Sequence, residues 1–255
     1  MSWIKFLGTA GARFVVMKQL RASGGLWLNI DDTNVLVDPG PGALVRCLSG
    51  KPRLNPLDLN GIILTHRHLD HSNDVNIMIE AMTNGGFKKK GVVFAPKDAL
   101  LEDDPVILRY VREHVEKIEV LQEKGSYTIG SIRFSTPVKH VHGVETYGLN
   151  IQGKNNSVSF ITDTRYFEGL ETYYNGDVLV INVVRLEEKK DIEHLSLKDA
   201  EKILSVNKPR LGVLTHFGMT MLKAKPWKLA EQLSEKLGVK VVAAGDGMMV
   251  DLDNY

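Results

Sequence analysis

The chain has 255 residues, of which 43% are hydrophobic and 25% are charged, proportions typical of a folded globular protein and unlike those of a disordered or fibrous one. Its 32 Lys and Arg nearly balance its 31 Asp and Glu, and the net charge of +1 disfavours a dedicated nucleic-acid binder. The single cysteine, Cys47, excludes an internal disulfide framework and any zinc site that needs two thiolates from one chain, and it favours a reducing, cytoplasmic location.

Short apolar runs and longer amphipathic stretches alternate along the first half of the chain. This pattern predicts strands at 3–8, 25–30, 35–38, 61–65 and 91–94, and helices at 73–82 and 105–115. No stretch approaches the roughly 20 apolar residues of a membrane span, so we expect no membrane partner.

The second half is richer in strand patterns. Apolar and polar residues alternate over 118–161 with several turn signals, which predicts successive antiparallel strands. Buried strands are expected at 177–184 and 211–215, with helices at 197–204 and 225–237. The helix at 197–204 has a capping-box start formed by Ser196 and Asp199. Because no Pro-, Gly- or Ser-rich linker interrupts the chain, we expect a single α/β domain over 1–255.

The segment from His66 to His71 holds four groups that can bind a metal, directly after an apolar strand. Side chains two apart in an extended loop point the same way, so His66 and His68 can bind one ion while Asp70 and His71 face a second. The alternative is a polar loop that caps a helix and binds no metal. Such a loop does not require four metal-binding side chains within six residues. The segment therefore predicts a metal site.

The pattern His-x-His-x-Asp-His resembles the signature of the metallo-β-lactamase superfamily, whose members share an αββα sandwich of two mixed β-sheets flanked by helices. Segments 6–11 and 38–42, together with Arg21, are similar to the branch that contains ribonuclease Z and related phosphodiesterases. The resemblance covers nearly the whole chain. It implies an α/β sandwich fold, a hydrolase activity and two divalent ions, Zn²⁺ or Mn²⁺.

The resemblance also implies three further ligands. His142 matches the ligand that completes the first ion's site, because Gly148 follows six residues later as in the family. His140 is the alternative ligand. If His142 is the ligand, His140 lies behind the site or on the surface. Asp163 matches the bridging carboxylate, and His216 matches the last ligand of the second ion. Taken singly, each could instead be a satisfied polar group at a strand end.

Two residues are implied to act in catalysis, Asp70 and His194. His194 resembles the proton donor of the phosphodiesterase-like members, and an imidazole suits this task because its unperturbed pKa is about 6.5. Its alternative is a histidine bonded to backbone beside a helix. Asp38 either orients a ligating imidazole through its second nitrogen or stabilises its own turn. Asp74 stands where the superfamily often has a glycine, and at this position it could cap the next helix.

The implied reaction is hydrolysis by a hydroxide bridging the two ions, with His194 protonating the leaving alcohol. Ribonuclease Z carries a long basic arm between the middle histidine and the bridging aspartate. Here only 21 residues separate His142 from Asp163, and Leu69 replaces a glycine usual in tRNA-processing members. We therefore expect a phosphodiesterase acting on small or cyclic phosphodiesters.

Three alternatives remain. A ribonuclease Z-like nuclease would act on tRNA, and a lactonase-type enzyme would cleave carboxylic esters with the same ions. A non-enzymatic metal-binding or sensory protein ranks last, because both Asp163 and His194 are present. Homodimers are common among the relatives, although no feature of this chain identifies an interface.

Overall fold

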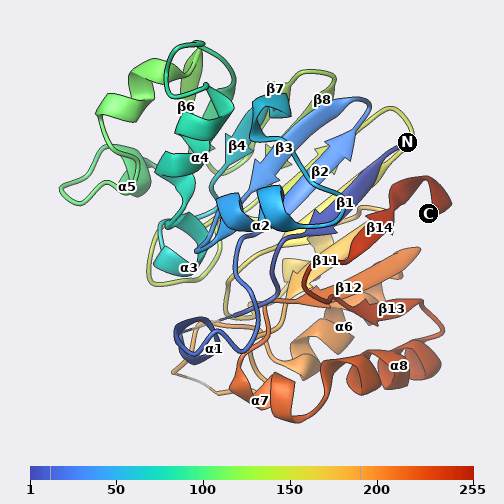
Figure 1. The fold of residues 1–255 in the computed structure, drawn as a ribbon. Helices are drawn as coiled ribbons and strands as arrows, with labels where there is room; N and C mark the ends of the chain where they lie inside the picture. The colour runs from blue at the N-terminus through green and yellow to red at the C-terminus, as the bar shows by residue number, and fades with distance from the viewer. Residues whose placement is uncertain (12, 190) are drawn as a thin grey trace.

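The computed structural model, which describes residues 1–11, 13–189 and 191–255, consists of two stacked β-sheets with helices on their outer faces (Figure 1). The first sheet has seven strands in the order β14-β1-β2-β3-β4-β5-β6, and the second has seven in the order β13-β12-β11-β10-β9-β8-β7. Each half of the chain thus builds one sheet, and the last strand returns to pair with the first. The expected αββα sandwich is confirmed.

The first sheet is antiparallel at its β1 side and parallel from β3 to β6. Its strands are β1 (Trp3–Phe6), β2 (Leu26–Ile30), β3 (Thr33–Val37), β4 (Gly61–Ile63), β5 (Val92–Ala95), β6 (Lys117–Val120) and β14 (Met249–Asp251). The helical segments of this half are α1 (Phe14–Met17), α2 (Ala43–Ser49), η1 (Pro56–Asp58), α3 (Leu69–Ser72), α4 (Val75–Met82), α5 (Lys97–Leu100) and η2 (Tyr110–His114).

The second sheet is antiparallel from β7 to β10 and parallel from β10 to β13. Its strands are β7 (Gly125–Ile129), β8 (Ile132–Thr136), β9 (Leu149–Gln152), β10 (Ser157–Ile161), β11 (Val178–Asn182), β12 (Leu211–Thr215) and β13 (Val241–Ala243). The helical segments are η3 (Leu170–Tyr173), α6 (Leu197–Asn207), α7 (Met219–Lys223), α8 (Pro226–Leu237) and η4 (Leu252–Asn254).

Three apolar layers hold the sandwich together, one between the sheets and one under the helices of each outer face. The alternation of β3 shows how the sequence builds them, because Val35 and Val37 join the layer between the sheets while Leu36 joins the layer with Cys47 of α2 and Met78 of α4. Strands β11 and β12 are buried on both faces and read as continuous apolar runs for that reason.

Two expectations about secondary structure were wrong. The segment 105–115 forms bends and a short 3-10 turn instead of a helix, because it docks on α4: the Asn76 side chain donates to the Val106 carbonyl and accepts from the Leu108 amide, both at 2.8 Å. These tertiary bonds override the local helical pattern. The first strand of 118–161 is also not antiparallel, because β6 pairs in parallel with β5 in the first sheet.

The capping box at the start of α6 is confirmed. The Ser196 side chain accepts from the Asp199 amide, and the Asp199 carboxylate accepts from the Ser196 amide. The helix continues to Asn207, past the expected end at residue 204. Among the residues that the structure describes, no helix is both long and apolar enough to cross a membrane.

The strand directions bring the candidate ligands to one edge of the sandwich. Polar segments follow the carboxyl ends of the parallel strands β3 and β4 in one sheet and β10, β11 and β12 in the other. Because the carboxyl ends of parallel strands lie at the same edge of a sheet, residues distant in sequence meet there. The β8–β9 connection contributes one more segment, which carries His142.

Candidate active site

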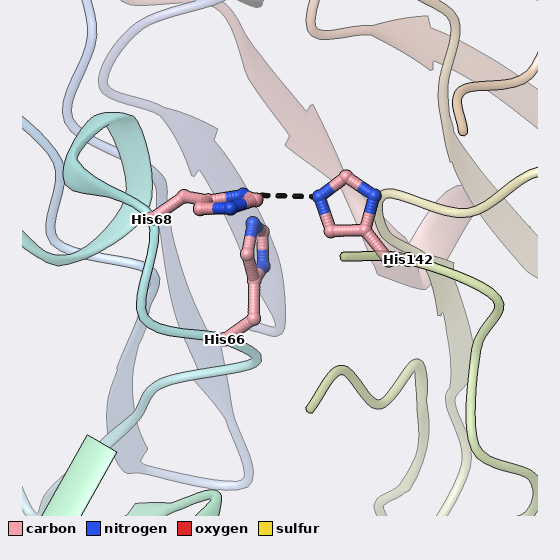
Figure 2. Close-up of side chains that lie close together, drawn as sticks. All are labelled: His66, His68 and His142. Carbon is pink, nitrogen blue, oxygen red and sulfur yellow. Dashed lines mark hydrogen bonds between the residues drawn. The ribbon is translucent and has the colours of Figure 1, made fainter. Parts of the chain in front are cut away.

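Three histidines form the first group of potential metal ligands, with one nitrogen of each lying within 4.8 Å of the others (Figure 2). His66 and His68 come from the segment after β4, and His142 reaches them from the β8–β9 connection. The Nε2 atom of His142 lies 3.0 Å from Nδ1 of His68. The other nitrogen of His142, Nδ1, donates to the Glu193 carbonyl at 3.0 Å, so Nε2 is the nitrogen that faces the group.

The second group adds carboxylates to imidazoles and consists of Asp70, His71, Asp163 and His216. One oxygen of Asp163, Oδ2, lies 3.4 Å from Nε2 of His71 and 3.4 Å from Nε2 of His216. Oδ2 of Asp70 lies 3.5 Å from the same His216 nitrogen. The structure therefore brings all seven expected ligands together in two adjacent groups.

Asp38 orients the histidines of both groups. Its Oδ2 accepts from Nδ1 of His71 at 2.9 Å and from the Thr65 hydroxyl at 2.7 Å, while Oδ1 accepts from the Thr65 amide at 2.7 Å. Because the Thr65 hydroxyl donates to Asp38, it accepts from Nδ1 of His66 at 3.1 Å. Both imidazoles thus direct Nε2 into the site, and the orienting role considered for Asp38 is confirmed.

Asp163 is held from two sides. The Asn182 amide, at the end of β11, donates to Oδ1 of Asp163 at 2.9 Å, which leaves Oδ2 facing the imidazoles. The main-chain carbonyl of Asp163 accepts from Nδ1 of His140 at 3.2 Å. His140 therefore lies behind the site, as expected if His142 is the ligand. Asn182 was not predicted from the sequence, although a single polar residue at the end of an apolar strand was a signal for it.

The residues present fit metal ions. Within residues 1–11, 13–189 and 191–255, four buried imidazole nitrogens of the site have no hydrogen-bond partner: Nε2 of His66, His71 and His216, and Nδ1 of His194. Leaving one such group unsatisfied costs about 1–3 kcal/mol, and a cation would satisfy several at once. Imidazole and carboxylate together suit zinc and manganese.

The charges of the second group favour a cation. Burial raises the pKa of Asp163, but the neighbouring imidazoles, His216 foremost, outweigh burial and hold that pKa well below its usual range. Burial likewise raises the pKa of Asp70, but His71 and His216 together outweigh burial, so this pKa is also low. Burial lowers the pKa of His216, but Asp163 and then Asp70 raise it to about 9. Both carboxylates are therefore ionised at neutral pH.

His194 lies at the edge of the two groups. Its Nδ1 is 3.4 Å from Oδ2 of Asp163, and its ring centroid is 5.1 Å from that of His142. Its side chain is 16% exposed, and it joins none of the groups of potential ligand atoms found in the described part of the chain. His194 is thus placed beside the ligands with access to solvent.

Asp74 does not cap its own helix. It precedes α4 without a side-chain capping bond, and its Oδ2 instead accepts from the Leu44 amide of α2 at 3.2 Å. The capping role considered for Asp74 was therefore wrong. The carboxylate joins α2 to the start of α4 behind the metal-binding segment.

Comparison with known proteins agrees with this geometry. A family model of the β-lactamase superfamily domain matches residues 33–217. The chain is 30% identical over 261 residues to an uncharacterized protein of Methanocaldococcus jannaschii, covering 98% of this chain and 95% of that protein.

Solved structures share the fold. The metallo-β-lactamase fold protein YhfI from Bacillus subtilis has a TM-score of 0.81 and 19% identity, with 98% of both chains covered. A diphosphatase of the PhnP family has a TM-score of 0.70 and 18% identity over 98% of this chain and 96% of that one. The short form of human tRNase Z has a TM-score of 0.69 and 15% identity over 99% of both. With its two-sheet sandwich and the family match over most of its length, this chain belongs to the metallo-β-lactamase superfamily.

Proposed function

We propose that this protein is a dinuclear metal-dependent phosphodiesterase that acts on small or cyclic phosphodiesters. The observation that carries the proposal is the pair of adjacent ligand groups, one of three imidazoles and one of two imidazoles and two carboxylates. Two such groups at one edge of the sandwich suit two divalent ions. Divalent ions supply Lewis-acid stabilisation of phosphoryl oxygens and lower the pKa of water.

Each ligand has a distinct part in this proposal. His66, His68 and His142 would hold one ion. Asp70, His71 and His216 would hold the other, and Asp163, whose Oδ2 faces His71 and His216, would be the carboxylate available to both. Asp38 and Asn182 keep these side chains in place, so that little reorganisation is needed when the ions bind.

His194 delivers a proton to the departing alcohol. It lies beside Asp163 and keeps access to solvent, a position from which an imidazole can reach a leaving oxygen and be reprotonated by water. Burial lowers its pKa, while the Asp163 carboxylate acts in the opposite direction. No serine or cysteine nucleophile is needed in this scheme.

Two features favour a small substrate. The connection between His142 and Asp163 consists of β9 and β10 with short links and carries no arm. Beside the metal-binding segment, Arg67 shares a surface hollow with the acidic side chains of Glu102, Asp103 and Asp104. Acidic side chains beside this segment repel a polyanion more strongly than they repel a single phosphodiester.

Names of structural neighbours add support from outside the chain. The PhnP-family protein is a diphosphatase and another neighbour is a tRNase Z, so this fold accommodates phosphate-ester chemistry. Those activities belong to the neighbours, and sequence identities of 18% and 15% indicate a shared fold alone.

The test combines metal content with three substrates on one preparation: bis(p-nitrophenyl) phosphate, a lactone and a precursor tRNA. We expect two ions per chain and hydrolysis of the diester alone. Lactone turnover without diester hydrolysis would replace the proposal with a carboxylic-ester hydrolase. Cleavage of the precursor tRNA would show a ribonuclease Z-like activity instead, and a chain without bound metal would refute the proposal altogether.

A further inference from the structure

A buried hydrogen-bonded chain connects the end of α6 to the shared ligand Asp163. The Asn207 amide of α6 donates to the main-chain carbonyl of Tyr174. The Tyr174 hydroxyl lies 2.5 Å from Nε2 of His140, and Nδ1 of His140 lies 3.2 Å from the carbonyl oxygen of Asp163. Tyr174 is fully buried and His140 is 3% exposed, so water does not compete for these bonds.

The direction of each bond follows from its partners. The Asp163 carbonyl can only accept, so Nδ1 of His140 carries the proton and Nε2 accepts from the Tyr174 hydroxyl. Burial raises the pKa of Tyr174, so the hydroxyl keeps its proton. The two rings meet edge to face, with centroids 5.8 Å apart.

Gly148 leaves the space that this contact needs. A Cβ atom at Gly148 would lie 2.3 Å from the Tyr174 hydroxyl, 2.8 Å from Nε2 of His140 and 2.8 Å from the main-chain carbonyl oxygen of Phe160 in β10. All three distances are far below van der Waals contact, so any larger residue would displace the hydroxyl and press on the β10 backbone. The glycine six residues after His142 thus has a physical reason in this chain: it makes room for the bond between Tyr174 and His140.

The same segment fixes the distance between the two ligand groups. Next to His140, the Val141 amide donates to the Thr164 hydroxyl at 3.1 Å, and the Val141 carbonyl accepts from the Arg165 amide at 2.9 Å. The β8–β9 connection that carries His142 therefore lies against the segment that carries Asp163. The His140 side chain connects these two segments at Asp163 itself, two residues before His142.

We infer that His140 and Tyr174 act as one positioning unit, which sets the place of the shared ligand Asp163 relative to His142 and thereby the affinity of the site for its ions. The inference rests on the proposed function, because it assigns a role toward the metals. Neither residue touches the substrate or the ions. Their effect on activity passes through Asp163.

The test measures Zn²⁺ dissociation constants by competition with a chromophoric chelator, together with thermal unfolding of the metal-free protein. Tyr174→Phe removes the hydroxyl alone, and Tyr173→Phe is the matched control, since Tyr173 is the neighbouring tyrosine and is 39% exposed. We expect Tyr174→Phe to weaken Zn²⁺ binding by about tenfold, the size seen when an outer partner of a ligand is removed. Tyr173→Phe should bind Zn²⁺ like the wild type.

Variants at the other two positions make the test independent of one substitution. His140→Leu should weaken Zn²⁺ binding by about ten- to a hundredfold. His140→Asn should recover part of this loss, because an asparagine amide can replace Nδ1 as the donor to Asp163. Gly148→Ala should weaken Zn²⁺ binding at least as much as Tyr174→Phe, because its Cβ would displace the hydroxyl and also press on the Phe160 carbonyl. In the His140→Leu background, Tyr174→Phe should add nothing.

Different outcomes separate this inference from the proposed function. If Tyr174→Phe lowers only the unfolding temperature of the metal-free protein and binds Zn²⁺ as tightly as the wild type, the unit is merely structural and the inference is wrong. Full additivity of the His140 and Tyr174 variants would also overturn it. A wild-type protein that binds no Zn²⁺ would overturn the proposed function and this inference together.

Discussion

The two ligand groups differ in charge and in burial. The first consists of imidazoles, and His68 and His142 are only partly buried. The second contains the carboxylates Asp70 and Asp163, and three of its four members are buried. A cation in the second group must displace the protons of His71 and His216, and it then meets two carboxylates in a poorly solvated site. Because carboxylates attract a cation more strongly than imidazoles do, we expect the second group to hold its ion more tightly.

The groups also differ in how they are assembled. Both take residues from the segment after β4, but the second group is completed by residues that follow β10 and β12 in the other sheet. In the second group Asp38 and Asn182 bond His71 and Asp163 directly, whereas Asp38 reaches His66 of the first group only through the Thr65 hydroxyl. The first group is completed by His142 from a connection between strands. One short sequence motif therefore contributes to a buried group with two carboxylates and to a more exposed group of three imidazoles.

The largest expected effect comes from Asp163→Ala, which removes the carboxylate that we propose the two ions share. The change leaves the facing nitrogens of His71 and His216 without their carboxylate, so metal binding should weaken by more than about a hundredfold and diester hydrolysis should be lost. Metal content after dialysis measures this. Asp58→Ala, at an exposed carboxylate in η1, is the control and should keep both ions. Retention of two ions by Asp163→Ala would refute the shared role.

His194→Ala should separate catalysis from metal binding. Since His194 joins neither ligand group in the described chain, the variant should keep both ions, while kcat falls by about 10²- to 10⁴-fold. The loss should be smaller for p-nitrophenyl esters than for alkyl esters, because p-nitrophenolate leaves without a proton. His114→Ala, in η2, serves as the matched histidine control. Equal losses of metal in His194→Ala and Asp163→Ala would assign His194 to the ligands instead.

A smaller effect should distinguish the two ions. Asp70→Asn keeps the size of the side chain and removes one charge from the second group, so the tighter Zn²⁺ dissociation constant should rise by about tenfold. His68→Ala should instead raise the dissociation constant of the more weakly bound Zn²⁺, because His68 belongs to the first group. Competition titrations that resolve two binding steps measure both. If Asp70→Asn raises only the dissociation constant of the more weakly bound Zn²⁺, the second group is not the tighter site.

The sequence predicted the ligands that lie close together far better than the residues that support them. The segment His66–His71 could be recognised because its four groups are contiguous, whereas Asp163 and His216 were found by family resemblance. Asn182 and Tyr174 were missed, since their bonds to Asp163 and His140 span 19 and 34 residues and depend on strand pairing. The absent helix at 105–115 has the same cause, a tertiary bond that local periodicity does not contain.

The smallest effect should come from the capping box that begins α6, two residues after His194. Ser196→Ala removes the side chain that accepts from the Asp199 amide, so the free energy of unfolding should fall by about 1 kcal/mol. Urea unfolding of the metal-free protein measures this loss. Both Zn²⁺ dissociation constants should stay unchanged, because Ser196 contacts no member of either ligand group among the bonds of the described residues. A change in Zn²⁺ affinity would show that the ligand groups depend on the helix as well as on the two sheet edges.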